Sequence, residues 1–147
     1  MEQQLDNFIH YLEAVRKSSR NTILSYKRDL EKFAAFLDAQ AVVDLADVNE
    51  TTMNAYILMM EQKQFATSTI SRNIAALKSF FDYLERYENH QVNPAARLKA
   101  PKIEKKAPEV LTVAEVTRLL EQPAGRNNKE LRDKAMLELM YATGIRV

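Results

Sequence analysis

The sequence predicts an all-α protein, and three observations point to that fold class. Only two glycines and four prolines interrupt 147 residues, so long stretches contain no helix-breaking residue. Hydrophobic residues make up 46% of the chain, and they recur three and four positions apart, as on one face of a helix. A chain of this length can bury one ordinary core, or the core of one domain of about 100 residues and part of a second.

Two helices are expected in the first 39 residues. The first runs from about Glu2 to Lys17, with apolar residues at helical spacing. Ser18 or Ser19 can cap the start of the second helix, which continues to about Ala39. The apolar stripe of this second helix has a heptad-like spacing that suits close packing against neighbouring helices. The stripe consists of Ile23, Tyr26, Leu30, Phe33 and Leu37.

Two further helices are expected after a connection at residues 40–48. Asn49 is a suitable cap for the third helix. The fourth helix is long, because its pattern begins at Thr67 or Ser68 and continues to about Tyr87. The apolar residues expected to face inward on these two helices are Met53, Tyr56, Ile57 and Met60, followed by Ile70, Ile74, Leu77, Phe81 and Leu84.

A linker is expected at residues 93–108. This segment contains three of the four prolines and five lysines and arginines, a composition typical of an extended connection between domains. The sequence therefore predicts a first domain at residues 1–92 and the start of a second at 109–147.

The second domain is expected to contain only two helices. Thr112 and Glu115 form a capping box at the start of the first. The second runs from about Asn128 to Ala142, and Gly144 stands where a left-handed C-terminal cap belongs. Two helices in roughly 40 residues are below the size at which a core sustains itself, so this domain is expected to be incomplete.

Composition excludes several classes of site. The chain has no cysteine, which rules out disulfides, thiolate metal ligands and thiol catalysis. His10 and His90 have no partner at the spacing of a metal site or a catalytic triad, and no metal or cofactor is expected. The N-terminus lacks a signal-peptide core and no apolar run is long enough to span a bilayer, so a cytoplasmic protein is expected.

The two long helices each carry a face that suits contact with DNA. The formal net charge is only +1, so this prediction depends on how charge is distributed. Small polar residues around an arginine let a helix approach a groove closely while keeping a donor for guanine or phosphate. An ordinary solvated surface is the alternative interpretation. The candidate residues are Asn21, Ser25, Arg28 and Lys32 on the second helix, and Ser68, Arg72, Ala75 and Ser79 on the fourth, flanked by Ser71 and Lys78.

Two further sets of residues are candidates for phosphate contacts. Thr22 and Thr69 stand near the helix starts, where they can bind phosphates beside exposed N–H groups or complete their own caps. The basic run of the linker can follow the DNA backbone or serve only as a tether. That run comprises Arg97, Lys99, Lys102, Lys105 and Lys106.

The most specific string of the sequence is the last one, RDKAMLELMYATGIRV, which includes Arg132, Thr143, Gly144 and Arg146. It resembles the first conserved box of tyrosine recombinases of the Xer and phage-integrase type, in which a helix ends at a Thr-Gly turn and an arginine follows. The resemblance extends through NPA at 93–95, the PK of the linker, VLTVAEV, and NTILSYKRDLEKF in the second helix. It covers essentially the whole chain.

The resemblance implies a SAM-like core-binding domain of four to five helices, followed by a truncated two-helix start of the catalytic domain. In this family the two domains clamp duplex DNA, and a C-terminal tyrosine forms a 3′-phosphotyrosyl intermediate without metal or ATP. Arg146 matches the first catalytic arginine, whose guanidinium can hold two oxygens of a scissile phosphate. Tyr26, Tyr56 and Tyr141 are expected to be structural, so this chain is expected to bind DNA but to be inactive in cleavage by itself.

The resemblance also implies partners. A complete recombinase works as a tetramer of protomers on paired DNA sites, in chromosome-dimer resolution or in the integration of mobile elements. Two other functions stay open at the level of sequence. The chain can act as a non-catalytic, truncated regulator of recombination, or as a helical protein-interaction module without DNA binding.

Overall fold

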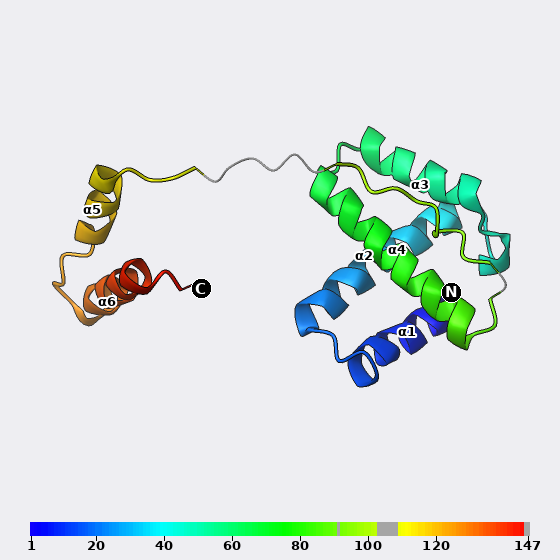
Figure 1. Ribbon diagram of the computed structural model, residues 1–147, viewed down its shortest axis with the longest axis horizontal. Coiled ribbons are helices and arrows are strands. Elements are labelled where there is room, and N and C mark those ends of the chain that lie inside the picture. The colour runs from blue at the N-terminus through cyan, green and yellow to red at the C-terminus, as the bar shows by residue number, and fades with distance from the viewer. Residues whose placement is uncertain (91, 103–108, 146–147) are drawn as a thin grey trace. The chain divides into compact units, whose positions relative to one another are not determined.

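The computed structural model describes residues 1–90, 92–102 and 109–145. It divides into two compact units, Met1–Glu104 and Lys105–Val147. The described residues form helices joined by turns, with no strand among them, so the all-α prediction is confirmed (Figure 1).

Unit 1 is a bundle built around its last helix. Its elements are α1 (Glu2–Ala14), α2 (Arg20–Ala39), the short 3-10 helix η1 (Leu45–Asp47), α3 (Glu50–Gln62) and α4 (Thr67–Tyr87). Helix α4 packs against α1, α2 and α3, and α1 also packs against α2. The central position of α4 in this unit is visible in Figure 1.

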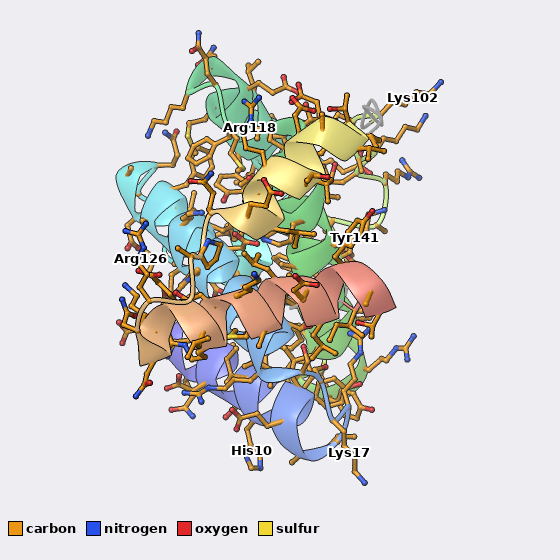
Figure 2. The ribbon with its side chains drawn as sticks, turned by 90° about the vertical axis from the view of Figure 1, so that its left-hand side faces the viewer. His10, Lys17, Lys102, Arg118, Arg126 and Tyr141 are labelled. Atoms are coloured by element: carbon orange, nitrogen blue, oxygen red, sulfur yellow. The ribbon has the colours of Figure 1, made fainter. Side chains whose placement is uncertain are left out.

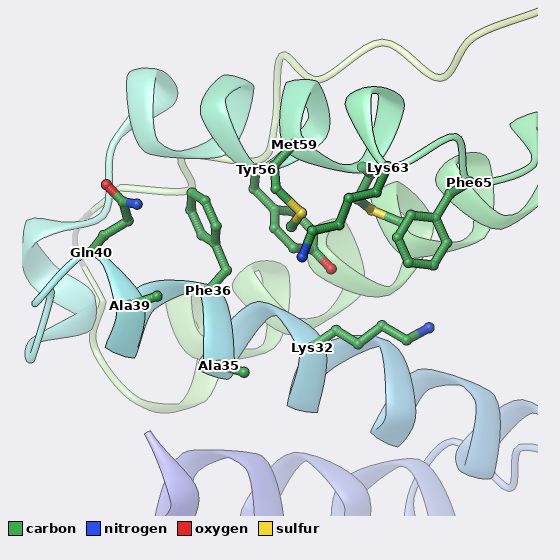
Figure 3. Close-up of a pocket in the computed structure, with 10 residues that line it drawn as sticks. Lys32, Ala35, Phe36, Ala39, Gln40, Tyr56, Met59, Lys63 and Phe65 are labelled. Atoms are coloured by element: carbon green, nitrogen blue, oxygen red, sulfur yellow. The ribbon is translucent and has the colours of Figure 1, made fainter.

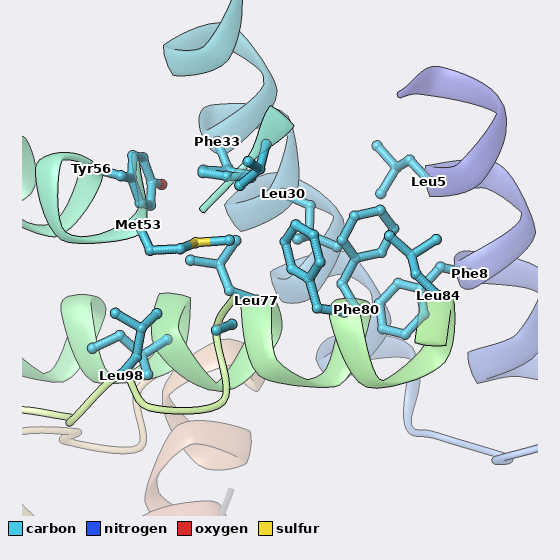
Figure 4. Packing of buried hydrophobic residues seen from close by; sticks show 14 of the residues in the cluster. Leu5, Phe8, Leu30, Phe33, Met53, Tyr56, Leu77, Phe80, Leu84 and Leu98 are labelled. Carbon is cyan, nitrogen blue, oxygen red and sulfur yellow. The ribbon is translucent and has the colours of Figure 1, made fainter. Parts of the chain in front are cut away.

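Aromatic side chains form the middle of the core of unit 1. Phe8 of α1 meets Phe80 of α4 edge to face, with ring centroids 5.4 Å apart. Phe33 of α2 meets Tyr56 of α3 in the same manner at 5.1 Å. These residues are fully buried and lie among leucines and methionines of the same helices (Figure 4). The core therefore joins all four long helices, as the apolar stripes predicted.

Local capping explains where the helices begin and end. Ser19 accepts a hydrogen bond from the N–H of Thr22, and Asn49 accepts one from Thr52, so both predicted caps are confirmed. Helix α1 ends at Ala14, earlier than the predicted Lys17. Lys17 has a φ of 50°, a left-handed conformation in which a helix cannot continue.

The core of unit 1 continues past residue 92, where the sequence analysis placed the end of the first domain. Asn93 folds the chain into a turn, because its Oδ1 accepts the N–H of Ala95 at 2.9 Å. Ala95 is fully buried and Leu98 is 9% exposed, and both belong to the core cluster. Figure 4 shows Leu98 beside α4. Part of the segment expected to be an extended linker therefore packs against the bundle; residues 103–108 lie outside the described residues.

Unit 2 contains α5 (Val113–Glu121) and α6 (Asn128–Thr143). The predicted capping box is confirmed, since Thr112 and Glu115 exchange both of its hydrogen bonds. Gly144 has the left-handed conformation expected of a C-terminal cap, with a φ of 64°. Neither helix contains a buried residue. Apolar side chains that remain exposed include Leu119, Leu131, Met136 and Leu139.

Within the described ranges, no helix combines the length and the apolar character needed to cross a bilayer.

Candidate nucleic-acid interface

Helix α2 presents most of its predicted polar face to the surface. Asn21, Arg28 and Lys32 are exposed, and Ser25 is half-buried. The side chain of Thr22 lies 2.9 Å from the hydroxyl of Ser19, so it takes part in the cap of its own helix. Arg28 is consequently a surface cation on the side of α2 opposite the core stripe.

Helix α4 carries the second predicted face. Ser68, Arg72 and Ala75 are exposed, while Ser71 and Lys78 are half-buried. The small side chains one helical turn on either side of Arg72 leave it as the largest group in this part of the surface. Thr69 is half-buried, and its N–H donates to the carbonyl of Ala66 in the first turn.

A buried carboxylate joins the two faces. Asp29 of α2 is 1% exposed, and Arg72 of α4 donates two hydrogen bonds to its carboxylate. Nε of Arg72 donates to Oδ2 at 2.7 Å, and Nη2 donates to Oδ1 at 3.0 Å. The Nζ of Lys32 lies 3.6 Å from the same Oδ1. The carboxylate raises the pKa of the Arg72 guanidinium, chiefly through these hydrogen bonds, so the guanidinium keeps its charge.

Asn73 binds this carboxylate from inside the core, and Tyr56 in turn binds Asn73. The Nδ2 of Asn73 donates to Asp29 Oδ1 at 2.9 Å and to the carbonyl of Thr69 at 3.0 Å. The Tyr56 hydroxyl donates to Oδ1 of Asn73 at 2.9 Å. Burial, with a smaller contribution from Asp29, raises the pKa of Tyr56 far above its ordinary value, which keeps this hydroxyl protonated as a donor. The network therefore links α2, α3 and α4 at a single point.

Asp29 and Asn73 are members of the site that the sequence did not predict. A usable signal was present, because each is a polar residue at an apolar position of its helix. Asp29 stands three residues after Tyr26, and Asn73 stands three residues after Ile70. A polar group on a buried stripe requires a hydrogen-bond partner, and two such groups on neighbouring helices can satisfy each other.

Ser79 lies in a different environment from the rest of the α4 face. Its hydroxyl accepts a hydrogen bond from Nη1 of Arg16 at 2.8 Å. Tyr83 and Tyr87 of α4 stack beside Tyr11 of α1 in the same hollow, with Tyr11 and Tyr87 ring centroids 5.2 Å apart. Ser79 therefore takes part in the contact of α4 with Tyr11 and Arg16.

The basic run of the predicted linker is partly described. Lys102 is exposed and extends away from the bundle (Figure 2). The backbone just before it approaches α4, since the Ser71 hydroxyl donates to the carbonyl of Pro101 at 3.5 Å. Arg97 lies 3.4 Å from Glu50 in an exposed ion pair. Lys105, Lys106 and the candidate catalytic Arg146 lie outside the described residues.

The tyrosines and histidines agree in part with their predicted roles. Tyr56 is fully buried and Tyr26 is half-buried, as expected of structural residues. Tyr141 is 63% exposed, so its predicted core position is wrong; α6 has no neighbour besides α5 within unit 2. His10 points away from α1 at the surface (Figure 2). Across the described ranges, no group of side chains has the composition of a metal site.

The structure also contains an apolar hollow of about 370 Å³ between α2 and α3. Phe36, Tyr56 and Met59 form its walls, and Lys32 and Lys63 stand at its edge (Figure 3). Lys32 extends over the ring of Phe65, with its Nζ 5.6 Å from the ring centroid. Phe65 lies in the connection between α3 and α4, so this contact joins Lys32 of α2 to that connection.

Comparison with known families identifies the fold of unit 1. Residues 5–88 match the family described as phage integrase, N-terminal SAM-like domain. The chain belongs to this family. The match covers most of α1, all of α2 to α4 and the whole Asp29–Arg72 network. The SAM-like fold expected from the resemblance is thereby confirmed.

Curated tyrosine recombinases align with the chain throughout its length. It is 43% identical to tyrosine recombinase XerC of Herpetosiphon aurantiacus over 148 aligned positions, which cover 100% of the chain and 48% of the relative. It is 36% identical to tyrosine recombinase XerD of Halalkalibacterium halodurans, covering 100% of the chain and 50% of that protein. The resemblance to tyrosine recombinases is confirmed, and the chain spans about half the length of the curated relatives it matches.

Proposed function

We propose that unit 1 binds duplex DNA in a sequence-selective manner, as the N-terminal part of a tyrosine recombinase of the Xer type. The observation that carries the proposal is the joining of two exposed helix faces at the Asp29–Arg72 ion pair. That pair places the arginine of α4 next to α2, on which Arg28 and Lys32 are exposed. Membership of the phage integrase SAM-like family supports the same function.

The proposed interface consists of small and basic side chains on two packed helices. On α2 it comprises Asn21, Thr22, Ser25, Arg28 and Lys32, and on α4 it comprises Ser68, Thr69, Ser71, Arg72 and Lys78. Ser79, whose hydroxyl accepts a hydrogen bond from Arg16, lies at the end of this surface. We place Arg28 on a phosphate, because it is exposed and the described residues offer it no acidic partner within ion-pair distance. Lys102 extends the basic surface along the chain that leaves unit 1.

We also propose that unit 2 begins the catalytic domain of the recombinase. Its two helices leave their apolar residues exposed, as expected of helices that pack onto further elements. In this proposal Arg146 contacts the scissile phosphate, and strand cleavage through a 3′-phosphotyrosyl intermediate is the activity of the complete enzyme. The partners are then a double-stranded recombination site and other recombinase protomers in a tetramer.

The test is selection of bound duplexes from a random pool by the 147-residue chain at near-physiological salt, followed by sequencing. We expect enrichment of a half-site of roughly one helical turn of DNA. Arg28→Ala combined with Arg72→Ala should weaken binding and lower the dependence of the affinity on salt.

Lys27→Ala is the matched control. This lysine is on α2 as well, but it lines a hollow next to α1 together with Glu2, Asp6, Glu31 and Asp38. Its loss should leave affinity and salt dependence unchanged. If the double variant behaves like this control, the proposed face does not bind DNA, and salt-independent or absent binding by the parent chain would favour a protein-interaction module.

A further inference from the structure

Arg72 uses only one of its two hydrogen-bonding edges inside the protein. A guanidinium carries five N–H groups, and Asp29 accepts one from Nε and one from Nη2. The edge formed by Nη1 and the second hydrogen of Nη2 has no protein acceptor within the described ranges. The side chain is 44% exposed, so this remaining edge can reach a ligand.

The orientation of that edge is fixed before any ligand binds. Asp29 is held by Asn73, and Asn73 is held in turn by Thr69 and Tyr56. Both amide hydrogens and the carbonyl oxygen of Asn73 are therefore engaged, so its amide has one orientation. A side chain held in this way has already given up the rotamer freedom that a solvated arginine loses on binding.

We propose that Asp29 is a positioning residue that presents the outer edge of Arg72 to one guanine in the major groove of the target half-site. This inference rests on the proposed function and specifies which base of the DNA the protein recognises. Guanine offers two adjacent acceptors, O6 and N7, at the spacing of a guanidinium edge. Ser68 and Ala75, which are exposed one turn away on α4, leave room for a base pair to approach.

The charge of the ion pair favours guanine over a phosphate. A carboxylate at 2.7 Å largely cancels the field of the guanidinium at longer range, which weakens attraction to an anion. Hydrogen bonds to the neutral acceptors of a base depend more on the placement of the donors than on their net charge. Arg28 provides the contrast, because the described residues place no acid beside it.

The experiment replaces, one at a time, each guanine of the selected duplex with 7-deazaguanine, which lacks the N7 acceptor. The unaltered protein should lose about 10- to 100-fold in affinity at one position only. Inosine at that position keeps both N7 and O6 and should restore binding. This comparison requires no variant protein, so a folding defect cannot confuse it.

Variants then assign the effect to the pair. Arg72→Lys keeps the charge and Asp29→Asn keeps the size. In both variants, 7-deazaguanine at that position should lower the affinity far less than it does for the unaltered protein. This loss of affinity is called the 7-deazaguanine penalty. Arg28→Ala should retain the full penalty. It should also lower the slope of log affinity against log salt concentration by about one, the equivalent of one released counterion. If Asp29 has only a structural role, Asp29→Asn will lower the melting temperature but keep the penalty, and the proposal is overturned.

The remaining outcomes separate this inference from the proposed function. If the chain enriches a half-site but no guanine is sensitive to the loss of N7, Arg72 does not read guanine, although DNA binding stands. If Arg72→Lys weakens all duplexes equally, the arginine contacts phosphate and the inference is wrong. If the chain binds no duplex, the proposed function itself fails.

Discussion

The hydroxyl of Tyr56 donates a hydrogen bond to Oδ1 of Asn73 at 2.9 Å in the centre of unit 1. Tyr56→Phe removes the donor and leaves a buried amide oxygen without a partner, so we expect a loss of about 1–2 kcal/mol in the free energy of unfolding. Urea denaturation followed by circular dichroism measures this loss. Tyr26→Phe is the matched control on a half-buried tyrosine and should cost little.

The same tyrosine gives unit 1 a dependence on alkaline pH. Burial raises the pKa of Tyr56 in the folded state above the ordinary value of 10.0. The folded protein therefore retains a proton that the unfolded chain releases, and stability falls as the pH rises above about 10. The difference in stability between the parent chain and Tyr56→Phe should be constant below that pH and shrink above it. A difference that stays constant to pH 11 would contradict the buried, hydrogen-bonded hydroxyl.

Leu98 tests where unit 1 ends. Its side chain is 9% exposed and packs in the core cluster, so Leu98→Ala should lower the free energy of unfolding of unit 1 by about 2 kcal/mol. Lys99→Ala, at the exposed next position, should have almost no effect. Equal effects of the two substitutions in thermal denaturation would mean that residues 93–98 are a tether, as the sequence pattern suggested.

The start of α5 should respond to acid. Glu115 accepts hydrogen bonds from the N–H and hydroxyl of Thr112, both at 2.8 Å, and these lower the pKa of the carboxyl group below its ordinary value of 4.5. The cap is therefore fully formed above that pH and is lost as the pH falls through the lowered value. Carbon chemical shifts of α5 should report loss of helix over this range. In Glu115→Gln the shifts should not titrate there.

Amide exchange should differ between the two units. Helices α5 and α6 contain no buried residue, whereas eight residues of α4 are buried. Local opening costs less where few apolar contacts break, so amides of α6 should exchange much faster than those of α4. Equal protection in the two helices would show that unit 2 packs on another surface, such as a second copy of the chain.

The helices were predictable because their signals are local. Ser19, Asn49 and the Thr112–Glu115 box act within one turn, and the apolar spacing of α4 already identified its inward residues. The Asp29–Arg72 pair joins residues 43 positions apart. No local pattern predicts which acidic side chain an arginine will contact in the folded protein. For this reason the sequence predicts Arg72 as a DNA contact but not the carboxylate that orients it.

The linker prediction shows a second limit of local patterns. Prolines and lysines around Ala95 and Leu98 gave the segment the composition of a tether. Ala95 and Leu98 nevertheless join the core cluster, and Pro94 is buried beside them in the chain, so the first part of the segment packs onto the bundle. Burial of this kind depends on the shape of a surface formed by other segments.

The hydrogen-bond network of Asp29, Arg72, Asn73 and Tyr56 joins α2, α3 and α4, and it limits how the proposed DNA-binding surface can change during evolution or engineering. Inserting one residue into α4 before Arg72 would turn the arginine by about 100° around the helix and separate it from its carboxylate. Substitutions at the exposed Ser68, Ala75 or Arg28 leave that helix register intact. Retargeting this scaffold to new DNA sites should therefore proceed by exchange of side chains at fixed positions, while insertions and deletions are confined to the connections between helices.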